Sequence, residues 1–226
     1  VMMIIREKYL KRMIDAKDTE FIKVITGVRR SGKSTLLLMF KDYLVHHHVK
    51  EENIIYINFE SAMYDDIKNY KDLYQYIQKR IKDSKVYLLL DEVQNVEAWE
   101  KAINSFKVDF DIDIYIIGSN AYLLSSELST LLSGRYIEIK VYPLSFKEYL
   151  VFNQYDNQNI EDKFYEYLRY GGLPAITLIK NNDELVLSYL NDIYNTIVKK
   201  DIIDRNNIKD SSLLENIIKY LVTNIG

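Results

Sequence analysis

Short apolar runs alternate with amphipathic segments from residue 21 to residue 141, and this alternation constrains the fold more than any other feature. The apolar runs lack a polar face, which is typical of strands that are buried on both sides in a parallel sheet. We expect strands at 21–26, 54–59, 86–90, 112–117 and 136–141. We expect helices at 4–17, 33–45, 68–82, 97–108 and 121–132. The pattern predicts an α/β fold in which helices cover both faces of a five-stranded parallel sheet.

The pattern becomes purely helical after Pro143. Apolar residues at helical spacing predict further helices at 145–152, 160–170, 174–180, 184–200 and 210–224. We therefore expect two domains, an α/β core at 1–143 and a smaller all-helical domain at 144–226.

The turn after the first predicted strand has the pattern G-x-x-x-x-G-K-[ST], in which two glycines precede a lysine and a hydroxyl residue. The residues are Gly27, Val28, Arg29, Arg30, Ser31, Gly32, Lys33 and Ser34, and Thr35 follows them. An apolar strand before the turn and an amphipathic helix after it are the context that a phosphate-binding loop (P-loop) needs. Its backbone N–H groups wrap phosphates, Lys33 neutralises β- and γ-phosphate oxygens, and the Ser34 hydroxyl ligates Mg²⁺. The sequence predicts ATP, or a close relative, and Mg²⁺ as ligands.

Two acids end the third predicted strand, where Asp91 and Glu92 follow Val86–Leu90. Ligands of open α/β sheets bind at the carboxyl ends of the strands, so these acids and the P-loop are expected at one edge. Asp91 would complete the Mg²⁺ site with Ser34, and Glu92 would orient and deprotonate the attacking water. Two adjacent acids favour hydrolysis of the nucleotide over binding alone.

Composition limits the alternatives. The 226 residues carry a formal net charge of −3, which gives no whole-surface attraction to nucleic acid, although a local basic patch remains possible. The chain has no cysteine, which excludes disulfides and thiolate-ligated metals. No apolar run reaches the roughly 20 residues that span a bilayer, and we expect a cytoplasmic protein. His46, His47 and His48 are consecutive in a predicted helix and point in different directions, so a shared metal is not expected.

In this order and spacing, the motifs resemble those of the AAA+ ATPases. More narrowly, they resemble bacterial and archaeal AAA-like ATPases that carry a poorly characterised, nuclease-like C-terminal domain. The segments that carry the resemblance are ITGVRRSGKSTLL (25–37), LDEVQNVEAWEKAI (90–103), GSNAYLLSSELSTLLSGRYIEIKVYPLSFKEYL (118–150) and YLRYGGLPAI (167–176). The resemblance implies an ATPase built on a P-loop sheet with a helical domain behind it.

The resemblance also implies roles for further residues. Asn120, with Ser119 as its neighbour, matches the sensor 1 position that contacts the γ-phosphate or the water; the alternative is a helix N-cap. Arg135 matches an arginine finger that acts on the next subunit; the alternative is a surface ion pair. Asn58 matches the polar residue that restrains the catalytic glutamate in many AAA+ proteins.

Two features depart from ring-forming AAA+ proteins. A second-sensor arginine cannot be assigned, and Arg169 and Arg205 are the candidates. The run from Gly171 to Pro174 resembles the narrower family and not the ring-forming unfoldases. The sequence ends at Gly226 inside a helical pattern, so we expect a fragment that lacks most of the C-terminal domain.

Three functions stay open at this point. The first is an ATPase that couples nucleotide state to movement of the helical part. The second is a nucleotide-gated switch or adaptor that binds a protein partner or a second copy of itself, with little turnover. The third, a DNA-transaction ATPase, rests on family analogy alone.

Overall fold

A computed structural model describes residues 4–82, 84–118, 132, 134–156, 158–179, 182–204 and 207–224 of the chain. Side chains of residues 199–201 and 204 are outside this description. The helix predicted at 121–132 lies, apart from Leu132, outside the described residues, as do Ser119, Asn120 and Arg205.

Five parallel strands form one sheet in the order β2-β3-β4-β1-β5. The strands are β1 (Ile22–Thr26), β2 (Ile54–Asn58), β3 (Val86–Asp91), β4 (Ile112–Ile117) and β5 (Tyr136–Lys140). Every residue of β1, β3 and β4 is buried, because these strands lie inside the sheet and helices cover both faces. The predicted α/β fold is confirmed.

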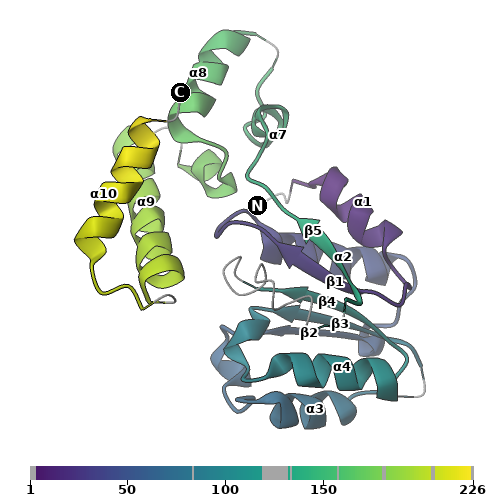
Figure 1. Ribbon diagram of the computed structural model, residues 1–226. Helices are drawn as coiled ribbons and strands as arrows, with labels where there is room; N and C mark the ends of the chain where they lie inside the picture. Colours follow the sequence, from purple (N-terminus) through teal and green to yellow (C-terminus); the bar gives the residue numbers. More distant parts are fainter. Residues whose placement is uncertain are drawn as a thin grey trace. The chain divides into compact units, whose positions relative to one another are not determined.

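Helices lie on both faces of the sheet (Figure 1). On one face are α1 (Glu7–Asp15) and α2 (Lys33–His46), which enclose an apolar core that includes Met13, Leu37 and Phe40. On the other face are α3 (Tyr70–Gln78) and α4 (Trp99–Asp109). They pack on a second core that includes Leu73 and Phe106. Three short 3₁₀ turns join these elements: η1 (Glu51–Asn53), η2 (Ala62–Tyr64) and η3 (Val93–Asn95).

The helix ends differ from the predicted ranges where capping decides them. The helix predicted at 68–82 begins at Tyr70, because Asn69 and Asp72 form a capping box that fixes its first turn. The helix predicted at 4–17 begins at Glu7. Ile5, inside the predicted range, precedes the helix and is 57% exposed, so the predicted start was too early.

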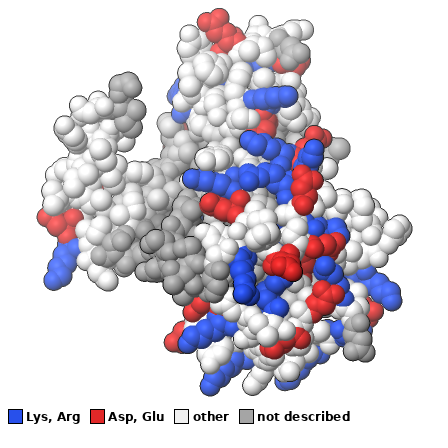
Figure 2. Space-filling view, turned by 45° about the vertical axis from the view of Figure 1, so that its right-hand side comes forward, with Lys and Arg blue, Asp and Glu red and all other residues white. Residues whose placement is uncertain are grey.

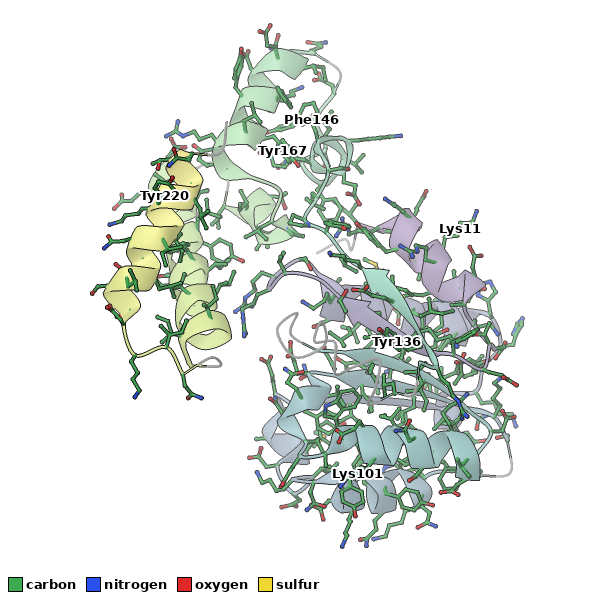
Figure 3. The ribbon with its side chains drawn as sticks, in the orientation of Figure 1. Lys11, Lys101, Tyr136, Phe146, Tyr167 and Tyr220 are labelled. Atoms are coloured by element: carbon green, nitrogen blue, oxygen red, sulfur yellow. The ribbon has the colours of Figure 1, made fainter. Side chains whose placement is uncertain are left out.

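A helical segment follows β5 and comprises α7 (Phe146–Phe152), α8 (Ile160–Tyr170) and the 3₁₀ helix η4 (Pro174–Leu178). Phe146 of α7 and Tyr167 of α8 face each other with ring centroids 5.5 Å apart (Figure 3). The predicted 174–180 helix is a tighter 3₁₀ turn.

By contacts the chain divides into two compact units, Val1–Leu178 and Ile179–Gly226. The second unit comprises α9 (Asp183–Thr196), a π-helical continuation η5 (Ile197–Asp204) and α10 (Ser211–Thr223). The segment 144–178 therefore lies with the sheet in the first unit. The predicted boundary at residue 143 stays a prediction about independent folding. No described helix is long and apolar enough to cross a membrane.

Candidate nucleotide-binding site

The P-loop connects the carboxyl end of β1 to the first turn of α2. Gly27 has a φ of 144°, and a Cβ at this position would lie 2.1 Å from the Val141 carbonyl oxygen, so only glycine fits. Gly32 has a φ of 91° and is the N-cap of α2. The loop therefore directs the amino end of α2, with its partial positive charge, into the space above the sheet, which is the geometry that binds phosphate.

Lys33 is buried at the start of α2, and its side chain folds back onto the loop. Its Nζ donates to the carbonyl oxygens of Gly27, at 2.9 Å, and Val28, at 3.1 Å. Ser34 is half-buried, whereas Thr35 is exposed. The lysine is thus held at the loop by the backbone that would surround the phosphates.

Asp91 ends β3 and is fully buried. Within the described part of the chain, neither of its carboxylate oxygens has a hydrogen-bond partner. Burial raises the pKa of Asp91 to about 6; the Ser34 hydroxyl and Lys33 partly offset this rise, and Glu92 and Glu60 add to it. Because β1 and β3 are parallel strands of one sheet, the P-loop after β1 and Asp91 at the end of β3 lie at the same edge of that sheet.

Glu92 has a left-handed backbone, with φ at 54°. For a residue other than glycine this conformation costs about 1 kcal/mol or more and is often found at functional sites. The Gln94 amide Nε2 donates to Glu92 Oε2. The Asn58 side chain, for which we predicted this role, instead accepts from the Glu60 N–H at 2.9 Å. Among the described residues, Gln94 therefore makes the restraint that was predicted for Asn58.

The turn between α8 and η4 reaches the P-loop. Pro174 Cγ lies 3.8 Å from the position that a Cβ on Gly32 would occupy. Gly172 packs against the Leu144 backbone: a Cβ there would lie 2.2 Å from the Leu144 oxygen, and the Gly172 oxygen accepts from Leu144 N–H at 2.6 Å. The sequence identified the run from Gly171 to Pro174 as a family feature, but it did not predict that this run lies near the P-loop.

Arg135 is exposed and precedes β5. Its carbonyl oxygen accepts from the Ile22 N–H at the start of β1, so it lies at the opposite end of the sheet from the P-loop. The length of β1, about 16 Å for five residues, exceeds the reach of an arginine side chain. Arg135 cannot serve the P-loop of its own chain, and its role on a neighbouring subunit stays a prediction.

Gly118 follows β4, the strand between β1 and β3. The sensor 1 candidates Ser119 and Asn120 come next in the sequence but lie outside the described residues. Of the second-sensor candidates, Arg169 is exposed near the end of α8. The roles of these residues stay predictions.

The model of the family described as AAA domain matches residues 19–150. The chain belongs to the AAA+ family of P-loop ATPases. A second match, to a domain of unknown function, covers residues 161–226 of this AAA+ chain. Membership of this family and the geometry of the P-loop together support nucleotide binding in general terms.

Two curated relatives match most of the chain. An uncharacterized protein of Haemophilus influenzae is 49% identical over 99% of this chain and 56% of its own length. An uncharacterized protein of Methanocaldococcus jannaschii is 34% identical over 90% of this chain and 47% of its own length. The chain thus spans about half the length of these relatives.

Two solved structures share the fold. The Walker-type ATPase PABY2304 of Pyrococcus abyssi has a TM-score of 0.55 at 14% identity, over 91% of this chain and 76% of its own. An S. cerevisiae Hsp104:casein complex has a TM-score of 0.50 at 13% identity, over 85% of this chain and 38% of its own. At these identities the likeness concerns the fold alone.

The residues present fit a nucleotide with its Mg²⁺. A buried carboxylate without hydrogen-bond partners is costly unless a cation compensates it, and Asp91 has no such partner in the part of the chain that the structure describes. Ser34 and Asp91 supply the hard oxygen ligands that Mg²⁺ prefers. The two glycines leave open the space that side chains would otherwise fill, so backbone N–H groups can approach phosphate oxygens.

Proposed function

We propose that the protein binds ATP with Mg²⁺ and hydrolyses it. Lys33 exchanges its bonds to the Gly27 and Val28 carbonyls for phosphate oxygens, and the loop N–H groups hold the β-phosphate. Ser34 and Asp91 would hold Mg²⁺, which would neutralise charge that develops on the phosphates. Glu92 orients the attacking water and accepts its proton.

The observation that carries this proposal is the pair of buried Asp91 oxygens, which have no hydrogen-bond partner among the described residues and lie at the same edge of the sheet as the P-loop. A carboxylate at a purely structural position would be paired or exposed, because burial of an unpaired charge is strongly unfavourable. Its place at the carboxyl end of a strand, next to a P-loop, favours a metal–phosphate ligand.

The same site offers a route from nucleotide state to the helical segment. Pro174 touches the region of Gly32, and Gly172 and Leu144 are joined through their backbones. Movement of the P-loop on nucleotide binding would therefore press on η4 and on the start of α7. We propose that this coupling moves the helical segment within the first unit.

Replacement of Glu92 tests the hydrolysis step. Glu92→Gln keeps the side-chain volume but removes the base, so we expect the turnover rate to fall at least about 100-fold while nucleotide affinity stays unchanged. Steady-state phosphate release and equilibrium binding of a fluorescent ATP analogue measure the two quantities. Glu97→Gln, at an exposed position between η3 and α4, is the matched control. Parent-rate hydrolysis by Glu92→Gln would remove Glu92 from this role.

A nucleotide-gated switch is the second candidate, and one observation favours it. The two side chains that turnover needs, Lys33 and Glu92, are both engaged within the protein, one by loop carbonyls and the other by Gln94. If these bonds persist with nucleotide bound, ATP would hold a conformation without rapid hydrolysis. Tight binding of ATP with negligible turnover would select this reading.

We infer that self-association completes the site if Arg135 is an arginine finger, because Arg135 lies beyond reach of the P-loop of its own chain.

Nucleic acid is the less favoured candidate partner. On the face that Figure 2 shows, lysines and arginines are interspersed with aspartates and glutamates, in contrast to the single-sign surface that phosphate backbones attract.

A further inference from the structure

Arg6 is a buried arginine whose guanidinium joins three parts of the first unit. It precedes α1, lies outside the segment 19–150 matched by the AAA family model, and is 5% exposed. Arginine has five N–H donors, and this side chain makes five hydrogen bonds. The acceptors are the two oxygens of Glu148 and the backbone oxygens of Ser31, Tyr142 and Pro143. A charge so completely bonded fixes the groups around it.

One of these bonds reaches the P-loop itself. Arg6 Nη1 donates to the Ser31 carbonyl oxygen at 3.1 Å. The next residue in the chain is Gly32. In a planar trans peptide the C=O and the following N–H point in opposite directions. Because Arg6 holds the Ser31 carbonyl on one side, the Gly32 N–H is turned to the other side, away from Arg6.

The opposite side of the guanidinium holds α7. Arg6 Nε and Nη2 donate to the two Glu148 oxygens at 2.9 and 3.0 Å in a forked pair. Glu148 also accepts from the N–H and the hydroxyl of Ser145, which caps α7. Burial alone would raise the pKa of Glu148, but Arg6 and Ser145 hold that pKa below its usual range. The carboxylate is thus ionised and shared between α7 and Arg6.

We propose that Arg6 is a positioning residue of the nucleotide site, which orients the Ser31–Gly32 peptide for phosphate and links the P-loop to α7 through Glu148. The proposal rests on the nucleotide binding proposed above. It adds a connection from the N-terminal helix to the P-loop that is independent of the turn at Gly172. A shift of the Ser31 carbonyl on nucleotide binding would move the Arg6 guanidinium. The other hydrogen bonds of this guanidinium all reach the β5–α7 connection or α7 itself.

Equilibrium binding of a fluorescent ADP analogue with Mg²⁺ tests the first half, because it requires no hydrolysis. Arg6→Ala should weaken the affinity of the folded protein about tenfold or more, the scale of a lost hydrogen bond to a charged group. Arg12→Ala is the matched control, since Arg12 lies in α1, the helix that follows Arg6, is exposed, and donates to the Glu138 carbonyl oxygen of β5. Wild-type affinity in Arg6→Ala would overturn the proposal, whereas failure of the parent chain to bind would overturn the proposed function itself.

Hydrogen exchange tests the second half. In the parent, the ADP analogue should slow exchange both in 27–36 and in 142–152, whereas in Arg6→Ala the second effect should be lost even at saturating ligand. A purely structural role would lower the melting temperature and leave that response intact, which contradicts the proposal. If Arg6→Ala does not fold, Arg6→Lys decides. It keeps the charge but cannot reach all five acceptors, so we expect at least threefold weaker binding; unchanged affinity and response would overturn the proposal.

Discussion

At the scale of single residues, Asp91 and Glu92 show which properties of the site can be predicted from the sequence and which cannot. Both acids could be assigned because they end an apolar strand, and the place of that edge beside a P-loop is a property of parallel sheets. The left-handed backbone of Glu92 and its bond to Gln94 could not be read from residue types. Nothing in the residue type or spacing of Gln94 signals that its amide holds the group that would activate water.

Gln94→Ala should slow hydrolysis about tenfold, because the Glu92 carboxylate then loses its fixed orientation toward water. Binding of the ADP analogue should stay the same, since the Gln94 amide donates to Glu92 and not to the P-loop among the described residues. Phosphate release under saturating ATP measures the effect. Gln75→Ala, an exposed glutamine of α3, serves as the control. Unchanged or faster hydrolysis in Gln94→Ala would show that the bond does not position the base.

At the scale of elements, the amino ends of β1, β3 and β4 are joined by charges on the side away from the nucleotide. Lys23 and Asp113 form a fully buried ion pair between β1 and β4. Asp18 precedes β1, donates its N–H to Asp113 at 2.9 Å and accepts from Tyr87 of β3 at 2.8 Å. This network ties three strands at one end, while the other end holds the P-loop and Asp91.

Asp18→Asn should reduce the free energy of unfolding at pH 7 by about 1 kcal/mol or less, because the carboxylate is partly exposed and screened by solvent. Partial burial opposes ionisation of Asp18, but Lys17, Lys85 and Tyr87 hold its pKa well below the usual range. The stabilisation is therefore present above the unfolded-state pKa of about 4 and is lost as pH falls below it.

Urea unfolding of the parent and of Asp18→Asn between pH 7 and pH 2 measures this effect. The two stabilities should converge at low pH. Asparagine tolerates the left-handed backbone of residue 18, where φ is 63°, so the substitution isolates the charge. Asp66→Asn, at an exposed position before α3, is the control. A difference that persists unchanged to pH 2 would contradict the assigned pKa.

At the scale of the whole molecule, local sequence patterns were sufficient to predict the sheet and the P-loop. They were not sufficient to predict contacts between residues that are far apart in the sequence. The β1–loop–α2 unit is continuous in sequence, so its residues predict its geometry. Arg6 and Glu148 are 142 positions apart, and no periodicity or spacing signals that they meet. Likewise, Gly172 could be identified as an unusual glycine, but its packing on Leu144 depends on how the helical segment lies against the core. The helix predicted at 4–17 begins only at Glu7, because the preceding Arg6 is held by these long-range bonds and has a non-helical backbone.

The chain spans about half the length of the curated relatives, and the account above concerns the AAA+ unit that it contains. Within that unit, the central claim is that Lys33 and Asp91 form one Mg²⁺-dependent ATPase site. Steady-state ATP hydrolysis over a range of protein concentrations, with and without Mg²⁺, tests it most directly. We predict turnover that requires Mg²⁺, is lost in Lys33→Ala and persists in Lys41→Ala, a control on the same helix. A rise in turnover per subunit with concentration would support Arg135 acting on a neighbour. Turnover that is indifferent to Mg²⁺ or to Lys33, or absence of both ATP binding and turnover at every concentration, would contradict the account.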